Sequence, residues 1–391
     1  MAKKSFSITA CVIGSIFALV VGAVVGFCGY SYLNFPNPQT DSDKYVSGDL
    51  QIHFIDFGNE YTGDCTYIKA GETDILIDAG SRPWEENVTT ISTYLNQYVE
   101  DNTLEYVIVT HADQDHIACF STNKQQSLFD IYKVGTLIDF PKSNKTTTVY
   151  ENYKKERAEA VSRGTIHYTA LQCWNETDGA QKVFELSSGI ELEILYNYYY
   201  ENNSSDENNY SVCAMINQGD KHFLFTGDLE HEGEEYLVEY NTLPKVELFK
   251  AGHHGSPTSS NDCLLDIIDP EICVVCCCAG SVEYSGDEST PELTYGSNDF
   301  KNFMKGTFPS QAFIDRISKH TEKVYVTTLV PVLYNSSKGE YENSDDVGSM
   351  NGNVVITSNK RGTEVQCSNN NTLLKDTEWF AKNRIMPPDW T

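Results

Sequence analysis

Short apolar runs and amphipathic stretches alternate along most of the chain. Residues 50–57, 66–69 and 74–77 are runs typical of strands, and residues 88–99 repeat apolar side chains at helical spacing. Similar patterns predict strands at 106–110, 190–196, 211–216, 223–225, 272–278, 324–328, 354–357 and 364–367, and helices at 150–163 and 310–320. Because strands and helices are interleaved, the pattern favours two sheets sandwiched by helices in one α/β domain.

The N-terminal segment has no charged side chain between Ser5 and Thr40. Within it, residues 8–30 are almost continuously apolar, which is about the length needed to cross a bilayer. We expect a signal anchor over residues 1–33 that is not cleaved, followed by a linker over residues 34–48. A cleaved signal peptide is the alternative.

The charges that flank this segment predict its orientation. Lys3 and Lys4 precede it, and acidic residues follow it. Because positively charged flanks stay in the cytoplasm, we expect a single-pass protein of the cell membrane whose main domain is extracytoplasmic. A stripe of small residues predicts either a weak homodimer or only the ordinary glycine content of membrane helices; the stripe consists of Gly14, Ala18, Gly22 and Gly26.

The composition excludes several classes of protein. The 28 basic and 56 acidic residues give a net charge of −28, so a stable nucleic-acid-coating role is excluded by long-range repulsion. The hydrophobic content of 40% argues against disorder. The twelve cysteines include a Cys273–Cys278 run, which we interpret as small apolar side chains in a buried strand, with a redox or zinc pair as the alternative.

Side chains with metal-binding chemistry cluster in three segments at the ends of predicted strands. Residues 110–116 follow a β-branched strand and hold two histidines and two aspartates, His111, Asp113, Asp115 and His116. Residues 223–228 run from an apolar strand into Gly227-Asp228, and residues 248–256 contain His253 and His254 between glycines. Imidazole and carboxylate bind Zn²⁺, Mn²⁺ and Fe²⁺, and three such loops are what a two-metal site needs.

These motifs together resemble the metallo-β-lactamase-fold hydrolases. The chain is most similar to one branch, the ComEC-type hydrolase domain of competence proteins, through residues 54–58, 63–64, 75–80, 208–211, 254–260 and 308–310. The resemblance covers about residues 50–367. It implies an α/β metallo-β-lactamase-like αββα four-layer sandwich over residues 49–375, preceded by the one N-terminal transmembrane helix and followed by a C-terminal tail over residues 376–391.

The resemblance also implies a set of metal ligands. The first ion would be held by His111 and Asp113, and the second by Asp115, His116 and a late histidine, with Asp228 bridging both. We favour His253 as the late ligand because it follows Gly252 directly at the strand end, and we expect His254 to face the substrate and donate a proton. Residues 208–211, where many relatives carry a further histidine, contain none.

The expected chemistry is metal-dependent hydrolysis. Two divalent ions, Zn²⁺ with Mn²⁺ as the alternative, would lower the pKa of a bridging water so that its hydroxide attacks the substrate, with Asp115 orienting it. Asp64 and Asp78 are expected to orient the ligand histidines. Hydroxyl and amide groups are expected to contact the substrate: Ser256, Thr258, Ser259 and Asn209.

Three functions are compatible with this site. A membrane-anchored, outward-facing phosphodiesterase or nuclease-type enzyme is the first expectation. A hydrolase of another ester, such as a choline-phosphate or lactone substrate, is the second. A binding or scaffold protein without catalysis is the third, because the middle histidine is missing.

Overall fold

The structure is a computed structural model. It describes residues 50–59, 61–81, 84–121, 125–279, 307–330, 332–335, 340–343 and 348–391. The expected anchor, its stripe of small residues and the linker lie outside the described residues. Within the described part of the chain, no helix is both long enough and apolar enough to span a membrane.

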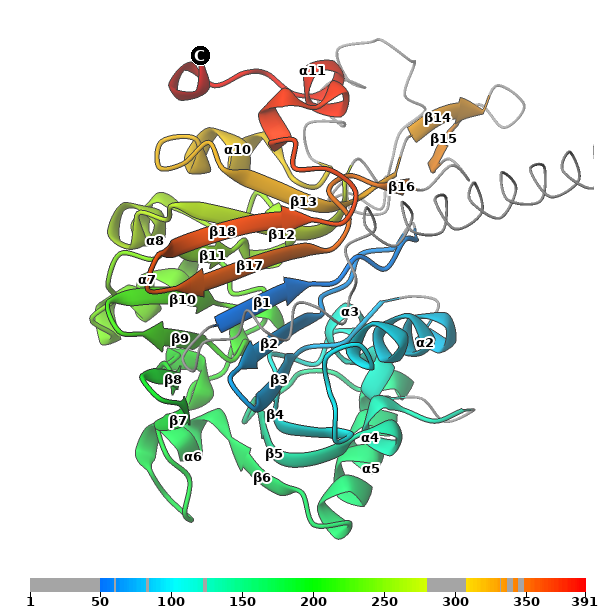
Figure 1. Cartoon of the computed structure of the whole chain (residues 1–391), viewed down its shortest axis with the longest axis vertical. Helices are drawn as coiled ribbons and strands as arrows, with labels where there is room; N and C mark the ends of the chain where they lie inside the picture. Colours follow the sequence, from blue (N-terminus) through cyan, green and yellow to red (C-terminus); the bar gives the residue numbers. More distant parts are fainter. Residues whose placement is uncertain are drawn as a thin grey trace, which may run out of the picture. The chain divides into compact units, whose positions relative to one another are not determined.

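One eight-stranded mixed sheet begins the domain (Figure 1). Its parallel strands are β3, β4, β5 and β6, and β2 pairs in antiparallel fashion with both β3 and β1. The spatial order is β18 (Gly362–Cys367), β17 (Val354–Asn359), β1 (Leu50–Phe54), β2 (Thr66–Ala70), β3 (Thr73–Ile77), β4 (Thr103–Val109), β5 (Lys133–Asp139) and β6 (Ile166–Thr169).

A second eight-stranded mixed sheet completes the core of the fold. Its parallel strands are β10, β11, β12 and β13. The spatial order is β16 (Gly348–Ser349), β13 (Val324–Leu329), β12 (Ile272–Ala279), β11 (Leu248–Lys250), β10 (Lys221–Phe225), β9 (Ala214–Gln218), β8 (Ile190–Ile194) and β7 (Val183–Ser187). A separate hairpin pairs β14 (Val332–Asn335) with β15 (Glu340–Asn343).

Helices cover the outer faces of both sheets (Figure 1). The first sheet is covered by α2 (Trp84–Leu95), α4 (Leu128–Ile131) and α5 (Thr148–Ser162), and the second by α7 (His231–Tyr240), α8 (Asp262–Ile268) and α10 (Gln311–Ile317). The shorter helices are α3 (Gln114–Ile117), α6 (Ala170–Asn175) and α11 (Glu378–Asn383). This arrangement is the four-layer α/β sandwich that the sequence predicts.

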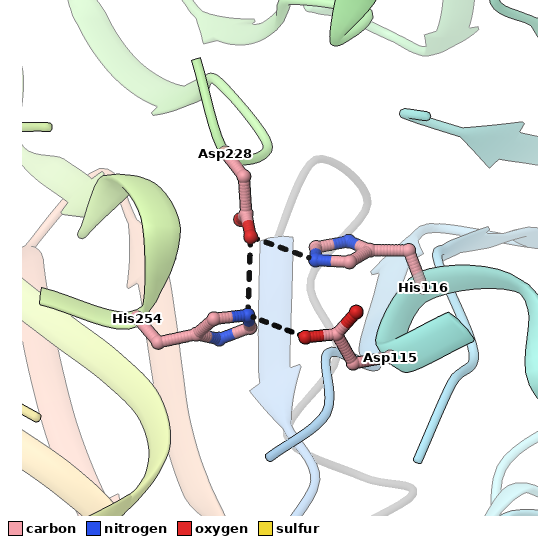
Figure 2. A group of neighbouring side chains, drawn as sticks. All are labelled: Asp115, His116, Asp228 and His254. Atoms are coloured by element: carbon pink, nitrogen blue, oxygen red, sulfur yellow. Dashed lines mark hydrogen bonds and ion pairs between the residues drawn. The ribbon is translucent and has the colours of Figure 1, made fainter. Parts of the chain in front are cut away.

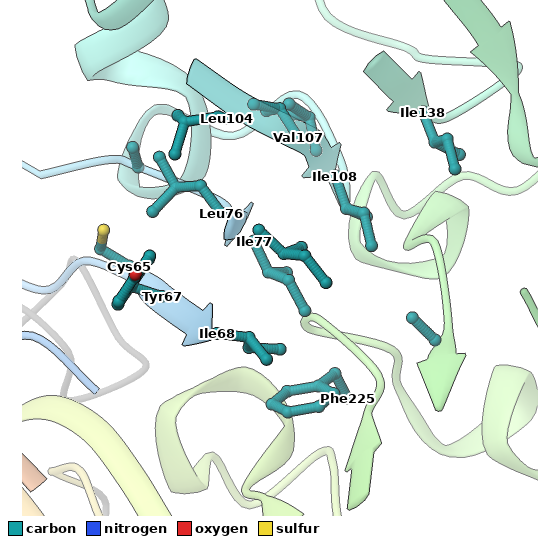
Figure 3. Close-up of a cluster of buried hydrophobic side chains, with 14 of the residues drawn as sticks. Cys65, Tyr67, Ile68, Leu76, Ile77, Leu104, Val107, Ile108, Ile138 and Phe225 are labelled. Carbon is teal, nitrogen blue, oxygen red and sulfur yellow. The ribbon is translucent and has the colours of Figure 1, made fainter. Parts of the chain in front are cut away.

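Two hydrophobic clusters follow from this layering. The larger one fills the space between the sheets and continues through the first sheet to its helices; Figure 3 shows Ile68, Ile108 and Phe225 within it. The smaller one joins the outer face of the second sheet to its helices. Successive residues of β10 alternate between the clusters, with Phe223 and Phe225 in the larger and Leu224 in the smaller, as the pleat of a strand requires.

The C-terminal residues 376–391, which we expected to form a separate tail, pack onto the domain. Trp379 and Phe380 of α11 and the later Trp390 belong to the smaller cluster. The Trp390 indole N–H donates a hydrogen bond to the Thr321 carbonyl at 2.8 Å. The compact unit therefore runs from Ser47 to Thr391.

The cysteine-rich strand matches the apolar interpretation. Cys273 and Cys276 of β12 are fully buried, and Cys276 belongs to the larger hydrophobic cluster and Cys273 to the smaller one. Because the two clusters lie on opposite faces of the strand, Cys273 and Cys276 face opposite sides of the sheet. They act as small core side chains.

Candidate metal centre

The candidate site lies at the carboxyl ends of parallel strands from both sheets. Asp78 follows β3, the segment from His111 to His116 follows β4, and Asp228 follows β10. The two consecutive histidines follow β11 within the short helix η5 (Gly252–Gly255). Loops at the carboxyl ends of parallel strands meet at one edge of a sheet, which explains why segments far apart in sequence converge here.

Four side chains form the centre of the site, and we call them the inner group: Asp115, His116, Asp228 and His254 (Figure 2). One ligand atom from each lies within 4.8 Å of the others. Asp228 Oδ2 is 3.1 Å from both His116 Nε2 and His254 Nε2, and His254 Nε2 is 3.4 Å from Asp115 Oδ2. The inner group contains four of the residues that the sequence predicts for the site.

His116 is held by a carboxylate behind it. Its Nδ1 donates to Asp78 Oδ2 at 2.8 Å, which leaves Nε2 facing Asp228. The backbone N–H and the hydroxyl of Thr110 also donate to Asp78, at 2.8 and 2.7 Å. Asp78 thus has the orienting position that the sequence predicts, since such a contact fixes both the tautomer and the ring orientation of a ligand histidine.

His254 is oriented by the backbone of the neighbouring strand. Its Nδ1 donates to the carbonyl oxygen of Cys276 in β12 at 2.7 Å, so Nε2 faces the inner group. Both nitrogens therefore face groups within the protein, and the ring is buried. This geometry does not support the substrate-facing, proton-donating position that we expected for His254.

His253 does not reach the inner group, although we favoured it as the late ligand. Its Nδ1 instead faces Thr258 Oγ1 and Glu230 Oε1, each at 3.3 Å, on the open side of the loop. The physical reason is the backbone: both histidines adopt the left-handed conformation, with φ of 45° for His253 and 53° for His254. The chain turns sharply there, and the second ring rather than the first enters the site.

His111 and Asp113 form a second, neighbouring group that we call the outer pair. His111 Nε2 is 3.7 Å from Asp113 Oδ2, and the His111 ring centroid is 4.1 Å from that of His116. His111 is buried, whereas 26% of the Asp113 side chain is exposed. The Ser211 hydroxyl lies 3.4 Å from His111 Nδ1, at the end of residues 208–211, which contain no histidine.

Lys250, which the sequence analysis did not select, lies inside the site. Its ammonium forms an ion pair with Asp64 and is 3.6 Å from Asp228 Oδ1, and only 4% of the side chain is exposed. Leu248 belongs to the cluster between the sheets and Phe249 to the outer cluster, so alternation along β11 points Lys250 inward. That alternation is a signal which could have identified Lys250 from the sequence.

Asp64 contacts the site through this lysine and through the histidines. Its Oδ1 lies 3.5 Å from His254 Nδ1, and its Oδ2 lies 3.8 Å from His116 Nδ1. The closer hydrogen-bond acceptors of these nitrogens are the Cys276 carbonyl and Asp78. Asp64 therefore serves mainly as the partner of Lys250.

The charges in the inner group depend on one another. Burial opposes protonation of His116, but Asp228 and Asp78 outweigh it and raise the pKa of His116 well above its usual value. Burial likewise opposes the charge on His254, whose pKa is raised by Asp228 and Asp64. The pKa of Asp228 is lowered against burial by these two histidines and Lys250. An arriving cation must therefore displace protons from the imidazoles.

Close backbone packing around the site requires glycine at one position. A Cβ on Gly80 would lie 2.3 Å from the backbone of both Asp115 and His116. The same loops are joined by hydrogen bonds from Ala79 N to His116 O at 2.9 Å and from Asp64 N to Asp115 O at 3.0 Å. Any larger residue at position 80 would displace the inner group.

The side chains expected to bind substrate are engaged within the protein. Ser259 is buried and donates to Leu229 O at 2.7 Å, and Thr258 donates to Glu230 at 2.8 Å. Ser256 and Thr258 hydroxyls are 2.8 Å apart. Asn209 accepts from the Glu230 N–H at 3.2 Å. In this structure these groups hold the loops around His253 and His254.

The donor set fits a divalent metal ion. A tetrahedral zinc site with bonds of about 2.0–2.2 Å places its ligand atoms roughly 3.3–3.6 Å apart, close to the spacings in the inner group. His254 Nε2, Asp228 Oδ1 and His111 Nε2 are buried and make no hydrogen bond within the described part of the chain. Buried polar atoms that make no hydrogen bond and are directed at neighbouring ligand atoms are what an ion would satisfy.

Comparison with known proteins agrees with this geometry. Residues 58–129 and 206–279 match the family model of the metallo-beta-lactamase superfamily. These two segments contain the inner group, the outer pair and Lys250.

Named relatives and a solved structure give further matches. The chain is 25% identical to ComE operon protein 3 of Bacillus subtilis over 252 residues, which are 59% of this chain and 28% of the relative. It is 36% identical to competence protein ComA of Neisseria gonorrhoeae over 146 residues, 37% of this chain and 18% of the relative. The chain thus spans 28% of the length of the first relative and 18% of the length of the second.

The structure of the metallo-beta-lactamase fold protein YhfI of Bacillus subtilis aligns over 71% of this chain and 96% of that protein, with 11% identity and a TM-score of 0.37. Two segments of the chain are thus similar to the metallo-beta-lactamase superfamily, and the chain is similar in sequence to ComE operon protein 3 and to competence protein ComA.

Proposed function

We propose that this protein is a metal-dependent hydrolase of phosphodiesters. The observation that supports it most is the inner group, in which two imidazole nitrogens and two carboxylates lie within 4.8 Å of one another. Zn²⁺ is the first candidate ion and Mn²⁺ the second. When bound, the ion would supply an activated water and polarise the substrate.

Each residue of the chain has a role in this proposal. His116, His254, Asp228 and Asp115 hold the ion. Asp78 and the Cys276 carbonyl keep the imidazoles in place, at 2.8 and 2.7 Å. His111 and Asp113 of the outer pair hold a second ion.

Metal analysis paired with hydrolysis tests the proposal directly. The purified full chain should contain one tightly bound divalent ion and a second, weaker one, and it should hydrolyse bis(p-nitrophenyl) phosphate. A chelator should abolish hydrolysis, and Zn²⁺ or Mn²⁺ should restore it. Metal-loaded protein that hydrolyses no phosphodiester, phosphomonoester or lactone would support the scaffold function instead.

A choline-phosphate ester is a second candidate substrate, favoured by a groove beside His253. The groove has a volume of about 540 Å³, and its lining includes three carboxylates and one tyrosine ring. Glu230, one of these carboxylates, also contacts His253. Carboxylates and an aromatic ring suit a quaternary ammonium group. Faster hydrolysis of p-nitrophenyl phosphocholine than of bis(p-nitrophenyl) phosphate would favour this substrate.

We also propose that the domain faces the outside of the cell and stays attached to the membrane. This part rests on the uncharged N-terminal segment and on Lys3 and Lys4 before it. Protease added to intact cells should digest the domain and leave a cytoplasmic marker intact. Recovery of the full-length protein in the soluble cytoplasmic fraction would contradict it.

A further inference from the structure

A lysine lies on the open side of the candidate metal centre. Lys145 belongs to the segment between β5 and α5, and its ammonium forms an ion pair with Asp113 Oδ1. The side chain is 31% exposed, so part of it can be reached from solvent. Asp113 Oδ2 faces His111 Nε2, which means that Lys145 and a metal ion can use different oxygens of the same carboxylate.

One buried carboxylate fixes this lysine beside the metal-binding loop. Glu207 Oε2 accepts a hydrogen bond from Asn144 N at 2.6 Å, and Glu207 Oε1 accepts one from Ala112 N at 3.3 Å. The neighbours of Lys145 and of Asp113 are therefore tied to a single side chain that is almost fully buried. The contact between Lys145 and Asp113 follows from this bridge, not from two flexible side chains meeting by chance.

Lys145 differs in accessibility from the other lysine of the site. The Lys250 side chain is 4% exposed, and its ammonium forms ion pairs with the buried Asp64 and Asp228. An ammonium has three donors, so the partly exposed Lys145 can donate to a ligand while it keeps its ion pair with Asp113. The site is rich in carboxylates, so an approaching anion needs a cation on the side from which it enters.

We propose that Lys145 binds the phosphate group of the substrate. The inference rests on the proposed function, because it assumes that a phosphate ester occupies the metal centre. Its position next to Asp113 places the ammonium at the edge of the outer pair, where a non-bridging phosphate oxygen can accept a hydrogen bond from it. The competing explanation is that Lys145 serves only as the counter-ion of Asp113.

The test compares four forms of the full-length, metal-loaded protein: wild type, Lys145→Ala, Lys145→Arg and Lys142→Ala. Lys142 is the matched control, because it lies in the same segment but donates to Glu201 O at 2.5 Å and Asn203 Oδ1 at 3.2 Å. Calorimetry measures the binding of inorganic phosphate. Kinetics with bis(p-nitrophenyl) phosphate give KM and kcat separately, and metal analysis gives the ion content.

Lys145→Ala should weaken phosphate binding and raise KM about 10- to 100-fold, the range for losing a hydrogen bond to a charged group. Lys145→Arg should recover most of the loss, and Lys142→Ala should behave as wild type. Ion content should be the same in all four forms. Unchanged phosphate affinity in Lys145→Ala, or no phosphate binding by any form, would overturn the proposal. A weaker phosphate affinity that is explained by a lower ion content in Lys145→Ala would also overturn it.

The results also separate this proposal from the proposed function. Phosphate binding that depends on Lys145, in a protein that hydrolyses no diester, would support the role of Lys145 and reject the diesterase. Hydrolysis of the diester with an unchanged KM in Lys145→Ala would support the diesterase and reject the role of Lys145.

Discussion

The inner group and the outer pair carry the same types of side chain but differ in what holds them. His116 and His254 each donate a short hydrogen bond to an acceptor behind the ring, and Asp228 lies beside a buried lysine. His111 has only hydroxyls near Nδ1, at 3.1 and 3.4 Å, and Asp113 is partly exposed. Residues that could bind metal are therefore not equally prepared to do so.

This difference predicts unequal metal affinity. Ligands that are already oriented lose little conformational entropy on binding an ion, whereas an exposed carboxylate paired with a lysine must be reorganised or shared. We expect the inner group to bind the first ion and the outer pair the second. The following changes test the comparison.

The largest effect is expected from Asp228→Asn. The change keeps the shape of the side chain but removes the charge at the centre of the inner group. The affinity for the first ion should fall more than about 100-fold, because orienting partners alone are worth about 10- to 100-fold. Calorimetric metal titration measures this, with Asp113→Asn as the matched change in the outer pair. Asp113→Asn should leave the first ion bound. If both variants lose the same affinity for the first ion, the inner group and the outer pair do not differ in metal binding.

Lys250→Met should destabilise the metal-free protein. It leaves Asp64 and Asp228 buried without their cation, and breaking a buried pair in this way costs about 3–5 kcal/mol. Urea unfolding of the metal-free protein measures the free energy of unfolding. Lys154→Met, which breaks an exposed pair with Glu151, is the control and should cost under about 1 kcal/mol. If Lys250→Met lowers the free energy of unfolding as little as the control does, the buried lysine does not stabilise the metal-free protein.

Asp78→Asn should lower the affinity for the first ion by about 10- to 100-fold without unfolding the domain. The reason is that His116 Nδ1 loses its charged acceptor at 2.8 Å, so the ring is held less firmly and Nε2 is less basic. Asp74→Asn is the control, since Asp74 is a buried carboxylate of the preceding strand that binds Tyr67 and Lys69. If both variants lower the affinity for the first ion equally, the cause is a loss of domain stability and not a loss of His116 orientation.

The smallest effect on metal binding is expected from His253→Ala. Its ring contacts Glu230 and Thr258 and lies outside the inner group, so the affinity for the first ion should be unchanged within error. His254→Ala should lose that ion. Metal titration of both variants shows whether His253 or His254 is the ligand. Loss of metal in His253→Ala but not in His254→Ala would show that His253 is the late ligand, as we expected from the sequence.

The order of elements and most of the candidate site follow from local patterns. Apolar runs predict most strands of both sheets but not β5, β6 and β7, whose patterns are more polar. Histidines and aspartates directly after strands predict the loops that converge. Asp115, His116 and Asp228 could be selected from the sequence because each follows a strand closely, and strand ends of parallel sheets share one edge. Asp78 could be selected for the same reason.

Only the tertiary structure decides contacts that depend on direction and on distant partners. Two adjacent histidines look alike in sequence, but the left-handed backbone and the Cys276 carbonyl bring His254 into the site and leave His253 outside. The sequence does not show which carboxylates Lys250 and Lys145 meet. The first is buried because the pleat of β11 directs it between the sheets, and the second meets Asp113 because Glu207 bridges two loops. The sequence determines which side chains are available near the edge of the sheets, and long-range packing determines which of them face one another.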